Sequence, residues 1–303
     1  MSNHKTNAAL IWNIAELLRG GWKQHEYQDV ILPLTVLRRL DCVLAPTKSS
    51  VMNAFHEHDG KINVDPILKH MTGVGFYNTS PYEFSKLLED QKDISKNLRH
   101  YINGFSPNVQ DIIEKFDFEK HLARLEGGNL LYLIIKDFEK VDLHPDAISN
   151  LEMGYLFEEL IRKFSEQSNE TAGEHYTPRE VIQMMVETMF TMDRAKIEKK
   201  HVIKTIYDPC CGTGGMLSVA KQFIREEIND QADVFLYGQE LNPITWAICK
   251  ADMLIKGELG ASGGDDRIKG GEKDSAIAST LSNDQFHSKK FDYILSNPPY
   301  GVD

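Results

Sequence analysis

A run of aromatic, polar and proline residues late in the chain has the composition of a binding clamp. The run from Phe291 to Gly301 indicates a short apolar strand followed by a rigid turn. The Asn297 side chain and the Pro298 carbonyl provide two hydrogen-bond acceptors, and the rings of Pro298 and Pro299 restrict the backbone beside them. Tyr300 offers a flat face for a planar ring. The turn is therefore suited to hold an exocyclic amine, although a simple proline turn after an edge strand would have the same residues.

A second candidate site is an acid followed by a glycine-rich loop. A strand-like segment, 202–207, leads into Asp208, and the loop that follows contains Gly212, Thr213, Gly214 and Gly215. The glycines let the backbone approach a ligand, and the start of the next helix presents free N–H groups. The spacing matches neither the dinucleotide motif GxGxxG nor the phosphate loop GxxxxGK[ST]. An acid at a strand end suits a ligand that carries an amino group.

A third candidate residue is Glu240, which follows the next strand-like segment, 234–238, and lies 25 residues after Gly215. A carboxylate at this place in a nucleotide-binding fold accepts hydrogen bonds from the two hydroxyls of a ribose. The alternative is an acid that only caps the helix predicted to begin at Pro243. The preceding glycine loop favours the ribose interpretation.

These residues lie where strands and helices alternate. Helices are expected at 177–190, 216–228 and 243–255, with strands at 202–207, 234–238 and 291–296. This order predicts a parallel sheet with crossover helices, whose ligands bind at the carboxyl ends of the strands. Residues 256–290 are polar and rich in glycine, and no element is assigned to them.

Residues 1–148 show helical periodicity and no alternating strand pattern. Leu10, Ile14, Leu17 and Leu18 are expected on one helix face, and a second helix is expected over 27–44 with a bend at Pro33. Ser80 and Pro81 predict the start of a further helix, 82–89. Later helical patterns pass through Leu98, Ile112, 130–138 and 151–164. We place the domain boundary at residue 148, and 165–173 form a polar linker.

The composition excludes several classes of protein. The chain has 303 residues, of which 41% are hydrophobic and 26% charged, a globular balance. No apolar run approaches a membrane span, so we expect a cytoplasmic protein without a membrane partner. The net charge of −11 argues against a protein that grips DNA alone through a broad basic surface. Four cysteines without CxxC spacing, and His56 and His58 in an expected loop, predict no metal site.

Together the motifs resemble those of amino-group methyltransferases that use S-adenosylmethionine. The pattern Asp-Pro-x-x-Gly-Thr-Gly-Gly from Asp208, the acid Glu240 and Asn-Pro-Pro-Tyr carry this resemblance. The segment from Gly173 to Val181 resembles the additional cofactor motif of DNA adenine-N6 methyltransferases. With its helical first half, the chain resembles the modification subunit of type I restriction–modification systems over nearly its whole length.

The resemblance implies a role for each motif. Asp208 would contact the methionine end of the cofactor and Glu240 its ribose, while Asn297, Pro298, Pro299 and Tyr300 would hold a flipped adenine. The remaining cofactor contacts would come from two segments, namely Glu174, His175, Tyr176, Thr177, Pro178 and Arg179, and Gly212, Thr213, Gly214 and Gly215. The cofactor's adenine would be met by Ser279, Asp265 or Asp266. Cys210 is not expected to be a nucleophile, because it lies in the cofactor loop.

The resemblance also implies a fold and partners. It predicts a helical amino-terminal domain, 1–148, and a Rossmann-like methyltransferase domain, 149–303, whose sheet is incomplete because the chain is truncated after the turn. Expected partners are DNA, a specificity subunit, a second modification subunit and restriction subunits. Two alternatives are a methyltransferase of protein glutamine or RNA bases, and a non-catalytic assembly subunit.

Overall fold

The computed structural model describes residues 3–168, 177–259 and 267–299, and the chain forms two compact units. The first unit comprises residues 1–170 and 251–265, and the second comprises 171–250 and 266–303. Helix α10 (Asn150–Ser168) therefore belongs to the first unit, and helix α14 (Pro243–Ile255) has residues in both. The domain boundary at residue 148 stays a prediction.

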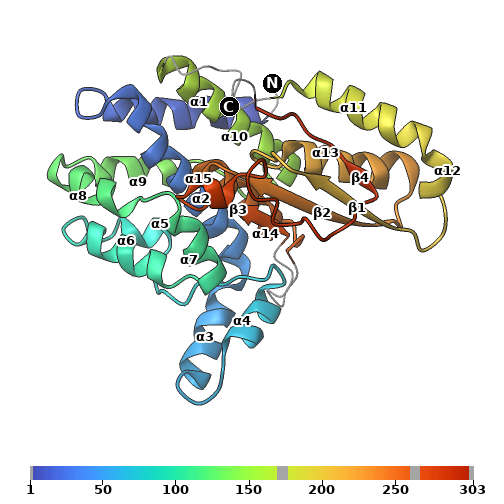
Figure 1. The fold of residues 1–303 in the computed structure, drawn as a ribbon. Helices are drawn as coiled ribbons and strands as arrows, with labels where there is room; N and C mark the ends of the chain where they lie inside the picture. Colours follow the sequence, from blue (N-terminus) through green and yellow to red (C-terminus); the bar gives the residue numbers. More distant parts are fainter. Residues whose placement is uncertain (1–2, 169–176, 260–266, 300–303) are drawn as a thin grey trace. The chain divides into compact units, whose positions relative to one another are not determined.

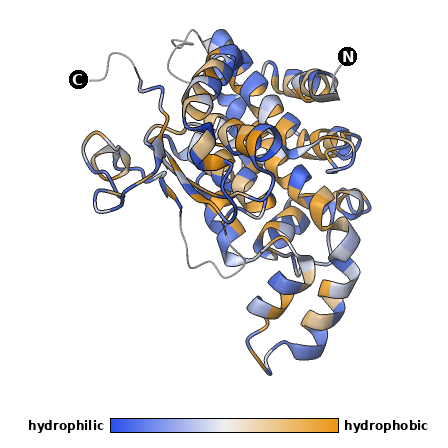
Figure 2. Cartoon of the chain, turned by 90° about the vertical axis from the view of Figure 1, so that its right-hand side faces the viewer, coloured by the Kyte–Doolittle hydropathy of each residue, from blue (hydrophilic) through white to orange (hydrophobic). Residues whose placement is uncertain are grey.

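The first unit is helical, as the sequence predicts. Hydrophobic and hydrophilic residues both occur along the helices of the chain (Figure 2), which allows a helix to bury one face and expose the other. Besides α10, they are α1 (Asn3–Ala15), α2 (Gln28–Leu44), α3 (Lys48–His58), α4 (Asp65–Thr72), α5 (Phe84–Leu87), α6 (Ile94–Asn103), α7 (Pro107–Glu114), α8 (Glu119–Gly127) and α9 (Leu131–Glu139). None of the helices in the described ranges combines the length and hydropathy needed to cross a membrane.

Helix α2 is largely buried and continues through Pro33. Its Arg39 is fully buried, which is costly for a charged side chain unless its donors are paired. Arg39 Nη1 donates to the carbonyls of Leu143 and Ile148, and Nη2 donates to Asn150 Oδ1 at 2.6 Å. The guanidinium thereby ties the segment between α9 and α10, and the first residue of α10, to α2.

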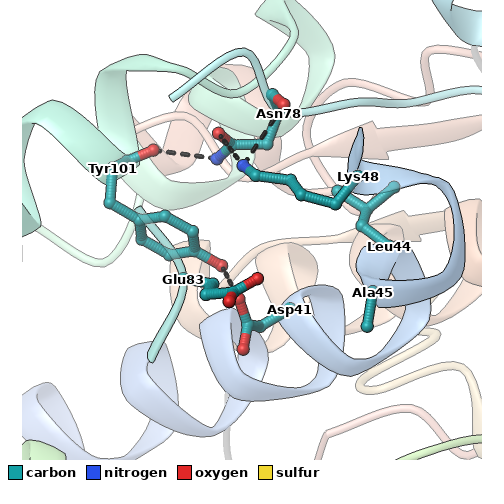
Figure 3. A pocket seen from close by; sticks show the side chains of 7 residues that line it. All are labelled: Asp41, Leu44, Ala45, Lys48, Asn78, Glu83 and Tyr101. Carbon is teal, nitrogen blue, oxygen red and sulfur yellow. Dashed lines mark hydrogen bonds between the residues drawn. The ribbon is translucent and has the colours of Figure 1, made fainter. Parts of the chain in front are cut away.

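A small polar pocket lies beside α2 and α3 (Figure 3). Tyr101 donates its hydroxyl to Asp41 Oδ1 at 3.1 Å, and Lys48 Nζ donates to Asn78 Oδ1, also at 3.1 Å. Asn78 Nδ2 in turn donates to the Tyr101 carbonyl at 2.9 Å. Burial disfavours the charged amine and lowers the pKa of Lys48 to about 8, while the Asp41 carboxylate partly opposes this shift.

Three local predictions in this unit are wrong. The helix expected at 82–89 is only α5, because the Ser80 hydroxyl is hydrogen-bonded to His100 Nδ1 at 2.8 Å and accepts Tyr82 N–H at 3.3 Å in a turn. Leu10 is 44% exposed, since α1 packs through neighbouring residues such as Ile11 and Ile14. His56 and His58 lie in the last turn of α3 and not in a loop.

The second unit contains a parallel sheet of four described strands in the order β3-β2-β1-β4 (Figure 1). The strands are β1 (Ile203–Asp208), β2 (Asp233–Glu240), β3 (Ile268–Gly270) and β4 (Tyr293–Ile294). Tyr207 of β1 pairs with Tyr237 of β2 on one side and with Ile294 of β4 on the other. The fold class is therefore confirmed: a helical part is followed by an α/β part with a parallel sheet.

Two strand assignments differ from the prediction. Strand β4 has two residues where six were expected, although Leu295 N–H still donates to the Tyr207 carbonyl at 3.0 Å. Strand β3 lies in the region left unassigned, because three residues among glycines and charges are too few for a recognisable period. Among the described strands β4 pairs only with β1, and the Ile294 side chain is exposed.

The helices of this unit hold the strand ends in place. They are α11 (Arg179–Met192), α12 (Arg194–Ile197), α13 (Gly215–Phe223), a π-helical turn (Ile224–Ile228), the first part of α14, and α15 (Ser275–Ala278). Helix α13 packs against β1 and β2 and lies beside α11 (Figure 1). On α11, Phe190 makes an edge contact with Tyr293 of β4, their ring centroids being 5.0 Å apart. Helix α11 is thus attached to β4.

Candidate functional site

The three predicted polar groups lie at one edge of the sheet. Strand β1 ends at Asp208, β2 ends at Glu240, and Asn297 follows β4 by three residues. Because the strands are parallel, their carboxyl ends meet at the same edge. Crossover topology therefore brings together residues that are far apart in the sequence. Asp208 and Asn297, for example, are separated by 89 positions.

Asp208 is a buried carboxyl group, with only 2% of its surface exposed. Its Oδ1 accepts the Cys210 N–H at 3.0 Å. Burial raises its pKa to about 7, and the nearby charge of Glu240 adds to the shift, while the Cys210 N–H and the Ser296 hydroxyl oppose it. At pH 7 the Asp208 carboxyl is therefore partly protonated. A cationic ligand would stabilise its ionised form through the attraction between opposite charges.

The glycine loop leaves open space beside its backbone. Gly212 and Gly214 have φ of +54° and +82°, and at Gly212 no neighbouring atom lies within 4 Å of the place where a Cβ would stand. Gly214 is the residue before α13, and none of the described side chains caps that helix. The left-handed backbone therefore turns the chain sharply and leaves the first N–H groups of α13 available to a ligand.

Glu240 links the second strand end to the glycine loop. Its Oε2 accepts the Gly212 N–H and its Oε1 accepts the Asn242 N–H, each at 2.7 Å. These bonds fix the carboxylate in one orientation. A half-buried carboxylate with both oxygens oriented matches the geometry that two neighbouring hydroxyls of a ribose need.

Asn297 is anchored by a residue from the segment before α11. Its Nδ2 donates to Thr177 Oγ1 at 2.9 Å, and Oδ1 has no donor among the described residues. Pro298 is exposed and Pro299 is half-buried. The structure therefore joins the proline turn with the additional motif that precedes the glycine loop. Tyr300 and the motif residues Glu174, His175 and Tyr176 lie outside the described residues.

The rest of the additional motif begins helix α11. Pro178 is the residue before the first turn, and Arg179 is the first helical residue. The backbone of Pro178 is extended, with φ −55° and ψ 139°, as is typical of the residue just before the first helical turn. Thr177 thus stands just outside the helix, where its side chain faces the turn after β4.

A segment of 278–285 that carries Ser279 is fixed to the end of β2 by Gln239. This side chain is completely buried; its Nε2 donates to the carbonyls of Ala278 and Asn283 at 2.8 Å, and its Oε1 accepts the Gln285 N–H at 3.0 Å. Thr280 Oγ1 also donates to the Pro209 carbonyl in the loop after Asp208. Ser279 therefore lies on a segment attached to the site, whereas Asp265 and Asp266 lie outside the described residues.

Gln239 and Thr280 were not predicted as site residues. A polar residue within an otherwise apolar strand, next to the candidate acid Glu240, was the only signal for Gln239. Thr280 follows the candidate Ser279, but its own contact had no signal, because the partner is a backbone carbonyl 71 residues away. Both residues position segments of the site.

The cysteines of the loop have separate structural environments. Burial and the charge of Asp208 raise the pKa of the Cys210 thiol, which disfavours the thiolate that a nucleophile requires. Cys211 is buried against β2, where a Cβ on Gly238 would lie only 2.8 Å from its Sγ. Gly238 is therefore the residue that lets the loop pack closely on the strand.

The combined geometry suits transfer chemistry on an amine. The buried acid and the glycine loop can hold a ligand with an amino group, and the oriented carboxylate can hold a ribose. The Asn297 amide oxygen can accept an N–H of a second ligand at the same sheet edge. None of these groups is an activated nucleophile, so the site favours a direct transfer over a covalent intermediate.

Family models match both parts of the chain. A model described as N-6 DNA Methylase matches residues 149–303, just over half of the chain, and one described as HsdM N-terminal domain matches 7–138.

The chain is also similar to curated proteins. It is 25% identical to the type I restriction enzyme MjaIX methylase subunit of Methanocaldococcus jannaschii, over 96% of this chain and 50% of that protein. It is 26% identical to the EcoEI methylase subunit of Escherichia coli, over 69% of this chain and 39% of that protein. The chain thus spans about half the length, or less, of these relatives.

A solved structure has the same fold. The type I restriction-modification system methyltransferase subunit from Streptococcus thermophilus aligns with a TM-score of 0.71 and 21% identity, over 99% of this chain and 64% of that chain. This agreement supports the order of a helical part and a parallel α/β part. Because the methylase model covers the whole sheet and its strand ends, the chain belongs to the N-6 DNA methylase family and has the amino-terminal domain of its HsdM members.

Proposed function

We propose that the chain transfers a methyl group from S-adenosylmethionine to the N6 amine of an adenine flipped out of DNA. In this proposal it is the methylase subunit of a type I restriction–modification complex in the cytoplasm. The observation that carries the proposal is the Asn297 amide, held by Thr177 at the sheet edge that also contains Asp208 and Glu240. The family membership supports the same activity.

The residues present fit the proposed cofactor. Asp208 would hold its amino group, and Glu240 would hold its ribose. Gly212 leaves the open backbone space that a close ligand requires. Ser279 is the described candidate for its adenine, and Glu174, His175, Tyr176, Pro178, Arg179, Thr213, Gly214 and Gly215 complete the proposed contacts. When bound, the cofactor supplies an electrophilic methyl group on its sulfonium.

The chain's own part in the reaction is to prepare the amine. The lone pair of adenine N6 is delocalised into the ring, so the nitrogen is a poor nucleophile. If Asn297 Oδ1 and the Pro298 carbonyl accept its two N–H bonds, they favour a pyramidal nitrogen whose lone pair is free to attack. Removing the base from the duplex costs a few kcal/mol, and stacking on Tyr300 would offset part of this.

The net charge of −11 indicates that this chain depends on another subunit of the complex for binding DNA. Phosphate contacts are made mainly by Lys and Arg, so an acidic chain needs a partner to hold DNA. We therefore propose that a specificity subunit supplies most of the DNA contacts. A second methylase subunit and restriction subunits are the further partners of such a complex.

A transfer assay tests the proposal. The chain, purified with its specificity subunit, would be incubated with tritiated S-adenosylmethionine and duplex DNA, RNA or protein. We expect label in N6-methyladenine of DNA, and a loss of at least about a hundredfold in Asn297→Ala, since an oriented acceptor contributes on this scale. Label only in RNA or in protein glutamine would refute the substrate. Unchanged transfer by Asn297→Ala would refute the mechanism.

A further inference from the structure

The hydrogen bond between Thr177 and Asn297 is supported by packing at some distance from it. The two residues are 120 positions apart, and Thr177 lies two residues before the start of α11. The other end of that region is fixed to β4, because Tyr293 donates its hydroxyl to Asp193 Oδ2 at 2.9 Å and packs edge-on against Phe190.

These contacts fix α11 along β4 at two points. The buried residues Ile182, Val186 and Phe190 hold one face of α11 within the second unit. The Tyr293 contacts set the position of the helix along the strand. Thr177 then stands opposite Asn297, which follows the strand by three positions. The bond to Asn297 is therefore part of the packing of α11 and is not an isolated surface contact.

We propose that Thr177 is a positioning residue that orients the Asn297 amide for the substrate amine, an inference that rests on the proposed function. A carboxamide can rotate by half a turn about its last bond and exchange its oxygen and nitrogen with little change of shape. In one orientation Oδ1 faces the substrate. In the other, N–H would face the N–H groups of adenine, and no hydrogen bond could form.

Thr177 favours the productive orientation by accepting the Nδ2 hydrogen. Pro298 and Pro299 already restrict the backbone after Asn297, so rotation of the amide is the main freedom that remains. One neutral hydrogen bond contributes on the order of a three- to tenfold preference. Thr177 would therefore act on the rate of transfer, and not on cofactor affinity as the sequence motif implied.

The test uses Thr177→Val, which keeps the shape of the side chain and removes the acceptor. In the complete complex we expect kcat for DNA methylation to fall about three- to tenfold, with the cofactor Kd unchanged. Thr177→Ser should restore most of the rate. Thr191→Val is the matched control, because Thr191 is an exposed residue of the same helix.

The decisive comparison is made in an Asn297→Asp background. A carboxylate presents an oxygen in both orientations, so Thr177→Val should have no further effect on kcat there. An equal fall in both backgrounds, or a weaker cofactor affinity with unchanged kcat, would overturn the inference and assign Thr177 to the cofactor.

A second measurement does not depend on activity. Hydrogen exchange of the Asn297 side-chain amide, followed by NMR with labelled asparagine, should be faster in Thr177→Val than in the wild type. An unchanged exchange rate would refute the positioning role even if the Asn297→Asp background has no activity. Absence of transfer by the wild-type complex would instead refute the proposed function.

Discussion

The unusual ionisation of Asp208 makes a sharp prediction about cofactor binding. Its pKa is raised to about 7 by burial, whereas the unfolded value is 3.8. If the ionised carboxylate is the form that binds the cofactor's amino group, binding must remove the proton. The fraction of protein with an ionised Asp208 is then about one tenth at pH 6, one half at pH 7 and nine tenths at pH 8. The association constant should rise about tenfold over these two pH units.

The matched variant is Asp208→Asn, which keeps the shape and can still accept the Cys210 N–H. It has no proton to lose, so its association constant should not rise with pH in this way. The cofactor's own α-amino group titrates near pH 8, but this affects both proteins and cancels in their ratio. Calorimetric titrations at pH 6, 7 and 8 would measure that ratio, and in two buffers they would also measure proton release.

The same shift has a consequence for stability without cofactor. Since the folded pKa is higher than the unfolded one, the folded state holds the proton more tightly. The contribution of the protonated Asp208 carboxyl to the free energy of unfolding is fully present below about pH 4. It is lost as the pH rises through about 7. About three pKa units correspond to roughly 4 kcal/mol at most. Asp208→Asn should therefore melt at a higher temperature than the wild type at pH 8, and at a similar one at pH 4.

Two results would refute this reasoning about Asp208. A wild-type association constant with the same pH dependence as that of Asp208→Asn would show that the carboxylate does not meet the amino group. A variant that is less stable than the wild type at pH 8 would show that the carboxyl is not held partly neutral in the fold.

Three further predictions concern the packing of the glycine loop, the attachment of residues 278–285 and the ionisation of Lys48. Gly238→Ala should lower the free energy of unfolding by about 1–3 kcal/mol in urea denaturation, because its Cβ would lie 2.8 Å from Cys211 Sγ; a neutral effect would contradict the packing. Gln239→Leu should make residues 278–285 more sensitive to limited proteolysis, since three hydrogen bonds are lost, and unchanged cleavage would count against its role. Lys48 has a folded pKa of about 8 against 10.5, so the unfolded state binds more protons between these values and stability should rise with pH there. Lys48→Met should not show this rise, and the same pH dependence in both proteins would refute the assignment.

The amino-acid sequence by itself determined the class of the fold and the candidate residues at the strand ends. Helical periodicity in the first half and strand–helix alternation in the second depend on local spacing, which a sequence displays directly. The acid, the glycine loop and the proline turn are likewise local motifs. Their alternation with helices predicts a common sheet edge, because parallel strands all end on the same side.

Only the tertiary structure decided how these groups are held. The bond from Asn297 to Thr177 spans 120 positions, and Gln239 holds carbonyls 39 and 44 positions away. Such pairs leave no period in the sequence, because the partner is chosen by the path of the backbone and not by spacing along it. Strand β3 was missed for a related reason: its three residues become a strand only through pairing with β2. The local motifs therefore identify the candidate groups of the site, while long-range packing sets their orientation.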